Sequence, residues 1–67
     1  MRFSIWPEAS DDWRTLVSRV RDAEAAGWDG VWIADHFIPN TPDATGDVNE
    51  CFALLAALAA AVPRMRI

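Results

Sequence analysis

The chain has 67 residues, a formal net charge of −4 and one cysteine. A single cysteine excludes an internal disulfide, and no Cys/His spacing indicates a structural zinc site. The six basic residues, all arginines, are scattered among ten acidic residues. This balance argues against nucleic acid or an anionic membrane surface as a partner.

The apolar segments are too short for targeting or for membrane insertion. The N-terminus lacks the long apolar core of a signal peptide and reaches Pro7 early. The longest apolar run, residues 51–62, is far shorter than the ~20 residues needed to cross a bilayer. We therefore expect a cytoplasmic protein whose partner is a small molecule rather than a nucleic acid or a membrane.

The first third of the chain predicts a strand followed by a helix. Residues 2–6 are apolar and rich in β-formers, and Pro7 ends them. Residues 10–12 (Ser-Asp-Asp) offer a choice of N-caps for a helix over residues 11–26. The apolar side chains of that helix recur at helical spacing and form one stripe: Trp13, Leu16, Val17, Val20 and Ala23.

A glycine separates this helix from the second predicted strand. Gly27 is expected at the left-handed position after the helix, with Trp28 packing back on the last turn. Residues 31–35 are nearly all apolar, which predicts a strand covered on both faces. Such strands are typical of the parallel sheet of an α/β protein.

The second half of the chain predicts a loop and a second helix. Residues 38–46 (IPNTPDATG) form a long loop between the strand and the helix. Asp47 is expected to cap a helix over residues 48–62, with Glu50 reaching back to complete a capping box. This helix is apolar on nearly every side and requires cover from neighbouring elements. Residues 64–67 read as the start of a third strand, so the order predicts βαβ units and a parallel sheet.

Titratable side chains follow the second predicted strand, at Asp35 and His36. Chemistry in α/β folds collects at the carboxyl ends of parallel strands, so both are candidate site residues. An imidazole that titrates near neutrality suits proton transfer, and a structural hydrogen bond is the alternative role for His36. The Asp35 carboxylate either contacts a ligand, caps a backbone turn or orients His36.

Three segments together resemble the N-terminal part of the luciferase-like flavin-dependent oxidoreductases. They are FSIWP (residues 3–7), GWDGVWIADHF (residues 27–37) and ECFALLAALAAAVPRMRI (residues 50–67), and the resemblance spans essentially the whole chain. Within that superfamily the chain looks most like the branch that uses the deazaflavin coenzyme F-420, with FMN as the alternative coenzyme. The resemblance implies a (β/α)8 TIM barrel whose coenzyme lies at the carboxyl ends of the strands.

The resemblance also implies roles for individual residues. Asp35 matches a position that touches the coenzyme, and His36 matches a position near the reacting ring carbon, which makes His36 the catalytic candidate. Trp6 ends the first strand and would stand at the same mouth of a barrel, either as a wall for a flat ring or packed in the core. The implied reaction is hydride transfer between the coenzyme and a small organic substrate, or oxygen activation for monooxygenation with FMN.

The length of the chain leaves two alternatives to an intact enzyme. A barrel of this kind needs about 250 residues, so 67 residues are expected to be its N-terminal part and inactive alone. The first alternative is a truncated, non-catalytic chain that is unstable alone or forms a homo-oligomer, because its strand edges and apolar faces would be exposed. The second is a small ligand-binding module that keeps only the part of the barrel mouth formed by Asp35 and His36.

Other interpretations of the same residues fit less well. No metal site is predicted, because the spacing of the acidic residues and the histidine in the middle of the chain matches no known metal-ligand motif. These residues are Asp35, His36, Asp43, Asp47 and Glu50. The helix over residues 48–62 lacks the basic face of a membrane-surface helix. Cys51 is expected to be a small buried apolar residue, since nothing near it in sequence lowers its pKa.

Overall fold

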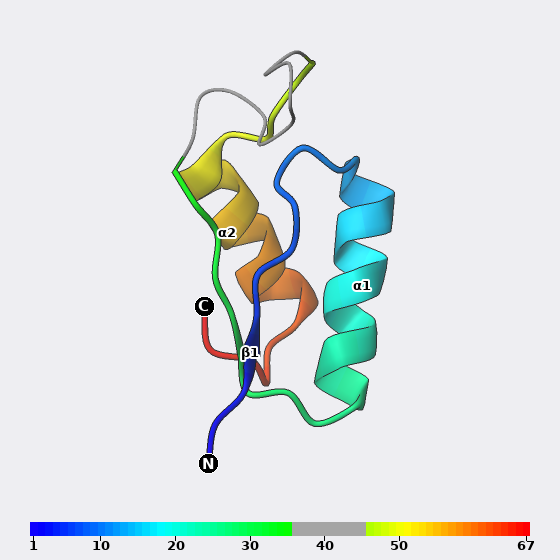
Figure 1. The fold of residues 1–67 in the computed structure, drawn as a ribbon, viewed down its shortest axis with the longest axis vertical. Coiled ribbons are helices and arrows are strands. Elements are labelled where there is room, and N and C mark those ends of the chain that lie inside the picture. Colours follow the sequence, from blue (N-terminus) through cyan, green and yellow to red (C-terminus); the bar gives the residue numbers. More distant parts are fainter. Residues whose placement is uncertain (36–45) are drawn as a thin grey trace.

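The structure is a computed structural model that describes residues 1–35 and 46–67. Its elements in chain order are β1 (Ser4–Ile5), α1 (Trp13–Ala25), β2 (Gly30–Val31) and α2 (Cys51–Ala61) (Figure 1). β1 and β2 run parallel, with Ser4 opposite Gly30 and Ile5 opposite Val31. This confirms the prediction of an α/β fold with parallel strands.

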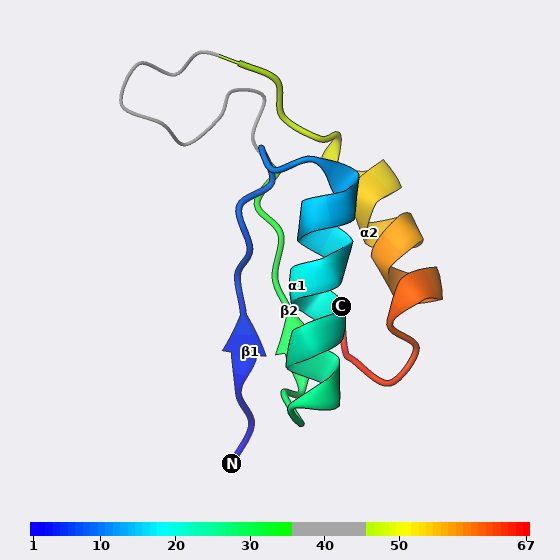
Figure 2. The same cartoon turned by 90° about the vertical axis from the view of Figure 1, so that its right-hand side faces the viewer.

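The chain after α2 returns to the sheet on the other side of β2. Arg66 forms a parallel bridge with Gly30, its N–H donates to the Asp29 carbonyl at 2.9 Å, and its carbonyl accepts from the Val31 N–H at 2.9 Å. β2 therefore lies between β1 and this returning segment, and strand order follows chain order. Figure 2 shows β1 and β2 side by side, with α1 beside them.

Both strands are shorter than the predicted ranges of 2–6 and 31–35. The parallel ladder extends by single hydrogen bonds: the Asp29 N–H donates to the Phe3 carbonyl at 2.8 Å, and the Trp32 N–H donates to the Ile5 carbonyl at 2.9 Å. Pro7 has no N–H and cannot continue the ladder. The pairing therefore ends where the sequence places a proline.

α1 begins at Trp13, because Asp12 is its N-cap and accepts the Thr15 N–H at 2.7 Å. The helix ends in a Schellman motif, in which the Trp28 N–H donates to the Ala23 carbonyl and the Gly27 N–H to the Glu24 carbonyl, both at 3.0 Å. Gly27 has φ of 92°, as expected for the left-handed position. These bonds confirm the glycine stop after this helix.

The α1 cap gives the folded chain a specific acid sensitivity. The hydrogen bond from the Thr15 N–H lowers the pKa of the Asp12 carboxyl below its ordinary value of 3.8. The ionised cap therefore stabilises the fold above the unfolded-state pKa, and this contribution is lost as pH falls through the lower, folded-state pKa. Asn caps equally well without titrating. Between about pH 6 and about pH 2 we expect the wild-type Tm to fall more than that of Asp12→Asn; parallel Tm curves by circular dichroism would contradict this assignment.

The N-cap of α2 differs from the prediction. Asp47 was expected to cap a helix starting at residue 48, but Glu50 is the N-cap of Cys51–Ala61 and accepts the Ala53 N–H at 2.6 Å. The predicted capping box is therefore wrong. Glu50 has an extended backbone (φ −65°, ψ 131°), so the helix starts only after it, and the preceding Asn49 N–H donates to the distant Ala9 carbonyl at 3.0 Å.

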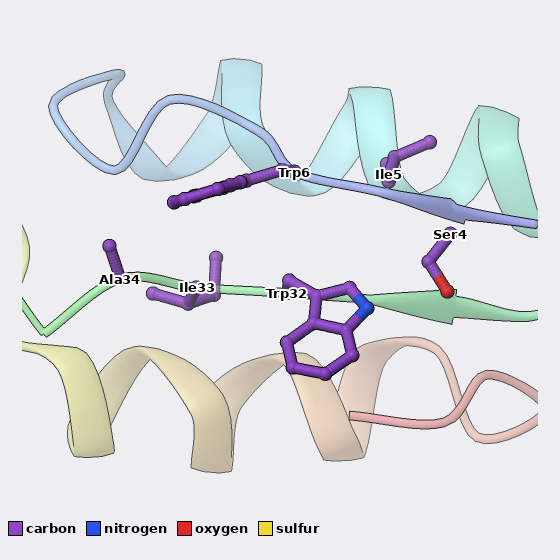
Figure 3. A pocket seen from close by; sticks show the side chains of 6 residues that line it. All are labelled: Ser4, Ile5, Trp6, Trp32, Ile33 and Ala34. Atoms are coloured by element: carbon purple, nitrogen blue, oxygen red, sulfur yellow. The ribbon is translucent and has the colours of Figure 1, made fainter.

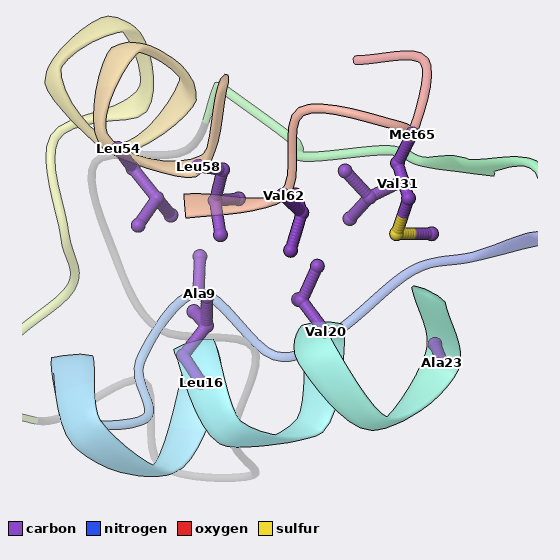
Figure 4. Packing of buried hydrophobic residues seen from close by; sticks show 9 residues of the cluster. All are labelled: Ala9, Leu16, Val20, Ala23, Val31, Leu54, Leu58, Val62 and Met65. Carbon is purple, nitrogen blue, oxygen red and sulfur yellow. The ribbon is translucent and has the colours of Figure 1, made fainter. Parts of the chain in front are cut away.

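A single hydrophobic core joins α1, α2 and one face of the sheet (Figure 4). Leu16 and Val20 of α1 meet Leu58 of α2, and all three side chains have no exposed surface. The full cluster is Ala9, Leu16, Val20, Ala23, Val31, Leu54, Leu58, Val62 and Met65. No helix in the described residues is long and apolar enough to cross a membrane.

The opposite face of the sheet is uncovered, which corrects the prediction of a strand buried on both sides. Val31 is 3% exposed, whereas the next residue, Trp32, is 68% exposed. Ser4 and Trp6 are also exposed, while Ile5 between them packs on the core. Neighbouring strand residues point to opposite faces, so the described residues bury only one face of this sheet. α2 likewise buries one side and leaves Phe52 69% exposed.

Candidate functional site

The carboxyl ends of β1 and β2 lie at the same edge of the sheet because the strands are parallel. An open pocket of about 520 Å³ lies there (Figure 3). Its lining residues come from β1 and from the two segments that follow the strands: Ser4, Ile5, Trp6, Trp32, Ile33 and Ala34. We call this the tryptophan pocket.

Two indole rings give the tryptophan pocket its chemistry. Trp6 is 71% exposed and Trp32 is 68% exposed, so both rings present apolar, π-bearing surface to a ligand. None of the six lining residues is charged, and the Ser4 hydroxyl and the indole N–H groups are the polar side-chain atoms. The volume falls within the range of small-molecule sites. The arrangement suits a flat, largely uncharged ring.

Trp6 and Trp32 lie on neighbouring strand ends and are both exposed. Within the described residues Trp6 lies outside the buried cluster and retains most of its surface. Trp32 was not singled out from the sequence, since it belongs to a strand expected to be covered on both faces. Its position directly across from Trp6 follows from the parallel register and from the Trp32 N–H bond to the Ile5 carbonyl.

Asp35 comes one residue after the pocket-lining segment and is exposed. It does not line the tryptophan pocket. Burial raises the pKa of the Cys51 thiol, and the negative charges of Asp35 and Glu50 raise it further. Asp35 therefore lies close enough to the start of α2 for its charge to act there. Cys51 is a buried free thiol, as expected from the sequence, and the raised pKa keeps it protonated.

The remaining predicted site residue, His36, lies outside the described residues, as do residues 38–45 of the predicted loop and the metal candidate Asp43. Within residues 1–35 and 46–67, no group of three or more His, Cys, Asp or Glu side chains could hold a metal ion. The structure thus places Trp6 beside Trp32 at the strand ends. Asp35 follows Trp32 by three residues.

Asn49 joins the two connections at this edge of the sheet, and the sequence gives no signal for it. Its side-chain amide donates to the Ala9 carbonyl at 2.7 Å and to the Asp11 carbonyl at 2.9 Å. Ala9 and Asp11 belong to the connection from β1 to α1, and Asn49 directly precedes the N-cap of α2. An asparagine before a helix is ordinarily read as a turn or capping residue, so its pairing partners cannot be read from spacing.

The comparisons with known proteins bear on the whole chain. The family model described as luciferase-like monooxygenase matches residues 1–67. Among curated proteins and among solved structures, no match to the chain is found. The match includes every residue of the tryptophan pocket, together with Asp35, His36 and Asn49.

Proposed function

We infer a function from one premise: the chain belongs to the luciferase-like monooxygenase family, because the model of that family matches residues 1–67. The family assignment makes the chain part of an oxidoreductase domain. We propose that these residues form the first βαβα portion of a (β/α)8 barrel, which in full takes about 250 residues. The strand-end edge with the tryptophan pocket would then belong to the mouth of that barrel.

Two structural features support the barrel proposal. The strands and the segment after α2 follow one another in chain order across the sheet, all parallel, as neighbouring barrel strands do. The covered face of the sheet carries the helices, and the face with Ser4, Trp6 and Trp32 is open. In a barrel the helices form the outer ring and the opposite strand face points to the interior, so this open face has a natural place.

We propose that the coenzyme is deazaflavin F-420, with FMN as the alternative, and that the substrate is a small organic molecule. When bound, the coenzyme supplies the hydride chemistry. Trp6 and Trp32 offer the aromatic surface that a flat ring system requires. Asp35 would contact the coenzyme or orient His36, and His36 would move the proton on the substrate oxygen. The tryptophan pocket at the strand ends is the observation that carries this proposal.

Titration of the full-length gene product with F-420 and, separately, with FMN tests the proposal. Equilibrium dialysis should give saturable binding of one of them, and failure of both to bind would contradict it. Trp6→Ala is expected to weaken that binding by about tenfold, because aromatic contacts are worth up to about 1.5 kcal/mol beyond burial. Trp6→Phe keeps an aromatic ring and serves as the matched control, with a loss of less than about threefold. Equal losses in both variants would remove the stacking role.

The open sheet face also supports a second candidate, a non-catalytic chain that associates with copies of itself. Trp6 and Trp32 are each more than half exposed on this face, and β1 has a partner on only one side among the described residues. Exposed strand edges and apolar faces promote association. Size-exclusion chromatography with light scattering separates the candidates: a coenzyme-free dimer that Trp32→Ser disrupts would favour this one.

A further inference from the structure

We propose that Asn49 is a positioning residue: its side chain holds the connection after β1 (residues 6–12) against the start of α2 and thereby sets the place of Trp6 at the tryptophan pocket. The coenzyme as occupant of this pocket rests on the proposed function. The positioning itself rests on contacts within the described residues.

Asn49 makes three hydrogen bonds to one short segment. Its amide nitrogen donates one hydrogen to the Ala9 carbonyl at 2.7 Å and the other to the Asp11 carbonyl at 2.9 Å. Its backbone N–H donates to the Ala9 carbonyl at 3.0 Å. A side-chain amide has two donor hydrogens, and both are used here. The side chain is half-buried, so water competes less for these carbonyls than at an exposed site.

Helix capping does not explain this side chain. The N-cap of α2 is Glu50, which accepts the Ala53 N–H at 2.6 Å, and Asn49 lies outside the helix. The partners of Asn49 lie 38 and 40 residues away in sequence, in a different connection. Aspartate has no donor hydrogens and would place a charge beside two carbonyl oxygens, and serine has a single donor. The pairing therefore requires an amide of this length.

Fixing the Ala9 carbonyl restricts Trp6. Two residues, Pro7 and Glu8, separate them, so they are at most about 10 Å apart along the chain. Pro7, between them, has a fixed φ and transmits the restriction. Ala9 is also held in the core at 8% exposure, which leaves few ways for the segment to move once Asn49 is bound.

Asp35, which ends the described segment after β2, lies near the start of α2. Asn49 lies two residues before Cys51, whose pKa is raised in part by the charge of Asp35. The start of α2 is thus near Asp35 on one side and bound to the connection after β1 on the other.

Fluorine NMR of the full-length gene product labelled with 5-fluorotryptophan tests this proposal. Each signal is assigned by a single Trp→Phe substitution. In Asn49→Asp we expect the Trp6 signal to shift or broaden while the Trp28 signal stays in place. Trp28 follows the C-terminal end of α1, away from Asn49, and packs on Phe3. Glu50→Ala is the matched control, because it removes the neighbouring cap of α2 but no bond to residues 9–11. It should leave the Trp6 signal in place.

The coenzyme titration is then repeated on the same variants. If residues 6–12 of a variant occupy the binding-competent position only a tenth of the time, the affinity for the coenzyme falls by about tenfold. We expect that loss for Asn49→Asp and a smaller one for Asn49→Ser, which keeps one donor. Circular dichroism verifies that each variant is folded, and Asn49→Ser replaces Asn49→Asp if the latter is not.

Two results would overturn the positioning proposal: an unchanged Trp6 signal in folded Asn49→Asp, or an equal Trp6 shift in Glu50→Ala. A shifted Trp6 signal with unchanged coenzyme affinity would support the positioning and overturn the proposed role of Trp6 in coenzyme binding. A wild-type protein that binds neither coenzyme would overturn the proposed function instead. In that case the Trp6 signal alone still decides whether Asn49 positions this connection.

Discussion

Gly30→Ala is expected to lower the free energy of unfolding by about 1–3 kcal/mol, the usual cost of forcing a group into packed space. A Cβ at Gly30 would lie 3.0 Å from the Arg66 carbonyl oxygen and 3.0 Å from the Ser4 Oγ. Gly30 lies in the middle of the sheet: it pairs with Ser4 of β1 on one side and with Arg66, in the segment after α2, on the other. The Arg66 oxygen is backbone and cannot rotate away, so the sheet itself has to shift.

A chain of this size has a total stability of roughly 3–10 kcal/mol, so this loss is large enough to follow by urea denaturation. The double variant Ser4→Ala with Gly30→Ala removes the Ser4 Oγ and should recover part of the loss. Ser4→Ala alone is the control and should change stability by less than about 0.5 kcal/mol. If Gly30→Ala is as stable as the wild type, the returning segment at Arg66 does not approach β2 this closely.

His36→Ala is expected to lower turnover of the full-length gene product by about 10²–10⁴-fold, the usual contribution of a general acid or base. The proposal assigns His36 to proton transfer on the substrate, so coenzyme affinity should change by less than about threefold. Removing a group used only in the transition state lowers kcat and kcat/KM together.

Oxidation of the reduced coenzyme by small carbonyl compounds, or reduction of the oxidised coenzyme by small alcohols, gives the rate, and dialysis gives the affinity. Asp35→Asn is the matched comparison, because it removes the neighbouring charge and keeps the side-chain shape. Unchanged turnover in His36→Ala would remove this residue from the mechanism. A loss confined to coenzyme affinity would make it a binding residue instead.

The parts of the fold that follow from local chemistry were predictable. Gly27 ends α1 in the left-handed conformation, and the Trp28 N–H returns to the Ala23 carbonyl. These features depend on a few adjacent residues, so the sequence carries them directly. Parallel pairing was also predictable, since the order of strands and helices leaves few topologies.

Features that depend on distant partners were not predictable. Asp47 and Glu50 have the spacing of a capping box, but the backbone is extended at Glu50, which is itself the N-cap, and Asn49 before it is bonded to the distant Ala9. The apolar run from Trp32 could not reveal that one face stays open, because an interior face and a solvent face both tolerate tryptophan. Trp6 was correctly placed at the strand ends by the proline after it, whereas its neighbour Trp32 required the register of the sheet.

The exposure of the tryptophans decides which optical signal is useful for this protein. Trp6, Trp13, Trp28 and Trp32 are between 40% and 71% exposed. We therefore expect the intrinsic emission of the folded chain to resemble that of indole in water, and thermal unfolding to change its wavelength little. Any molecule or chain that covers Trp6 and Trp32 will instead move the emission to shorter wavelengths. Fluorescence will therefore report occupancy of the sheet face, while the far-ultraviolet signal of the helices reports folding.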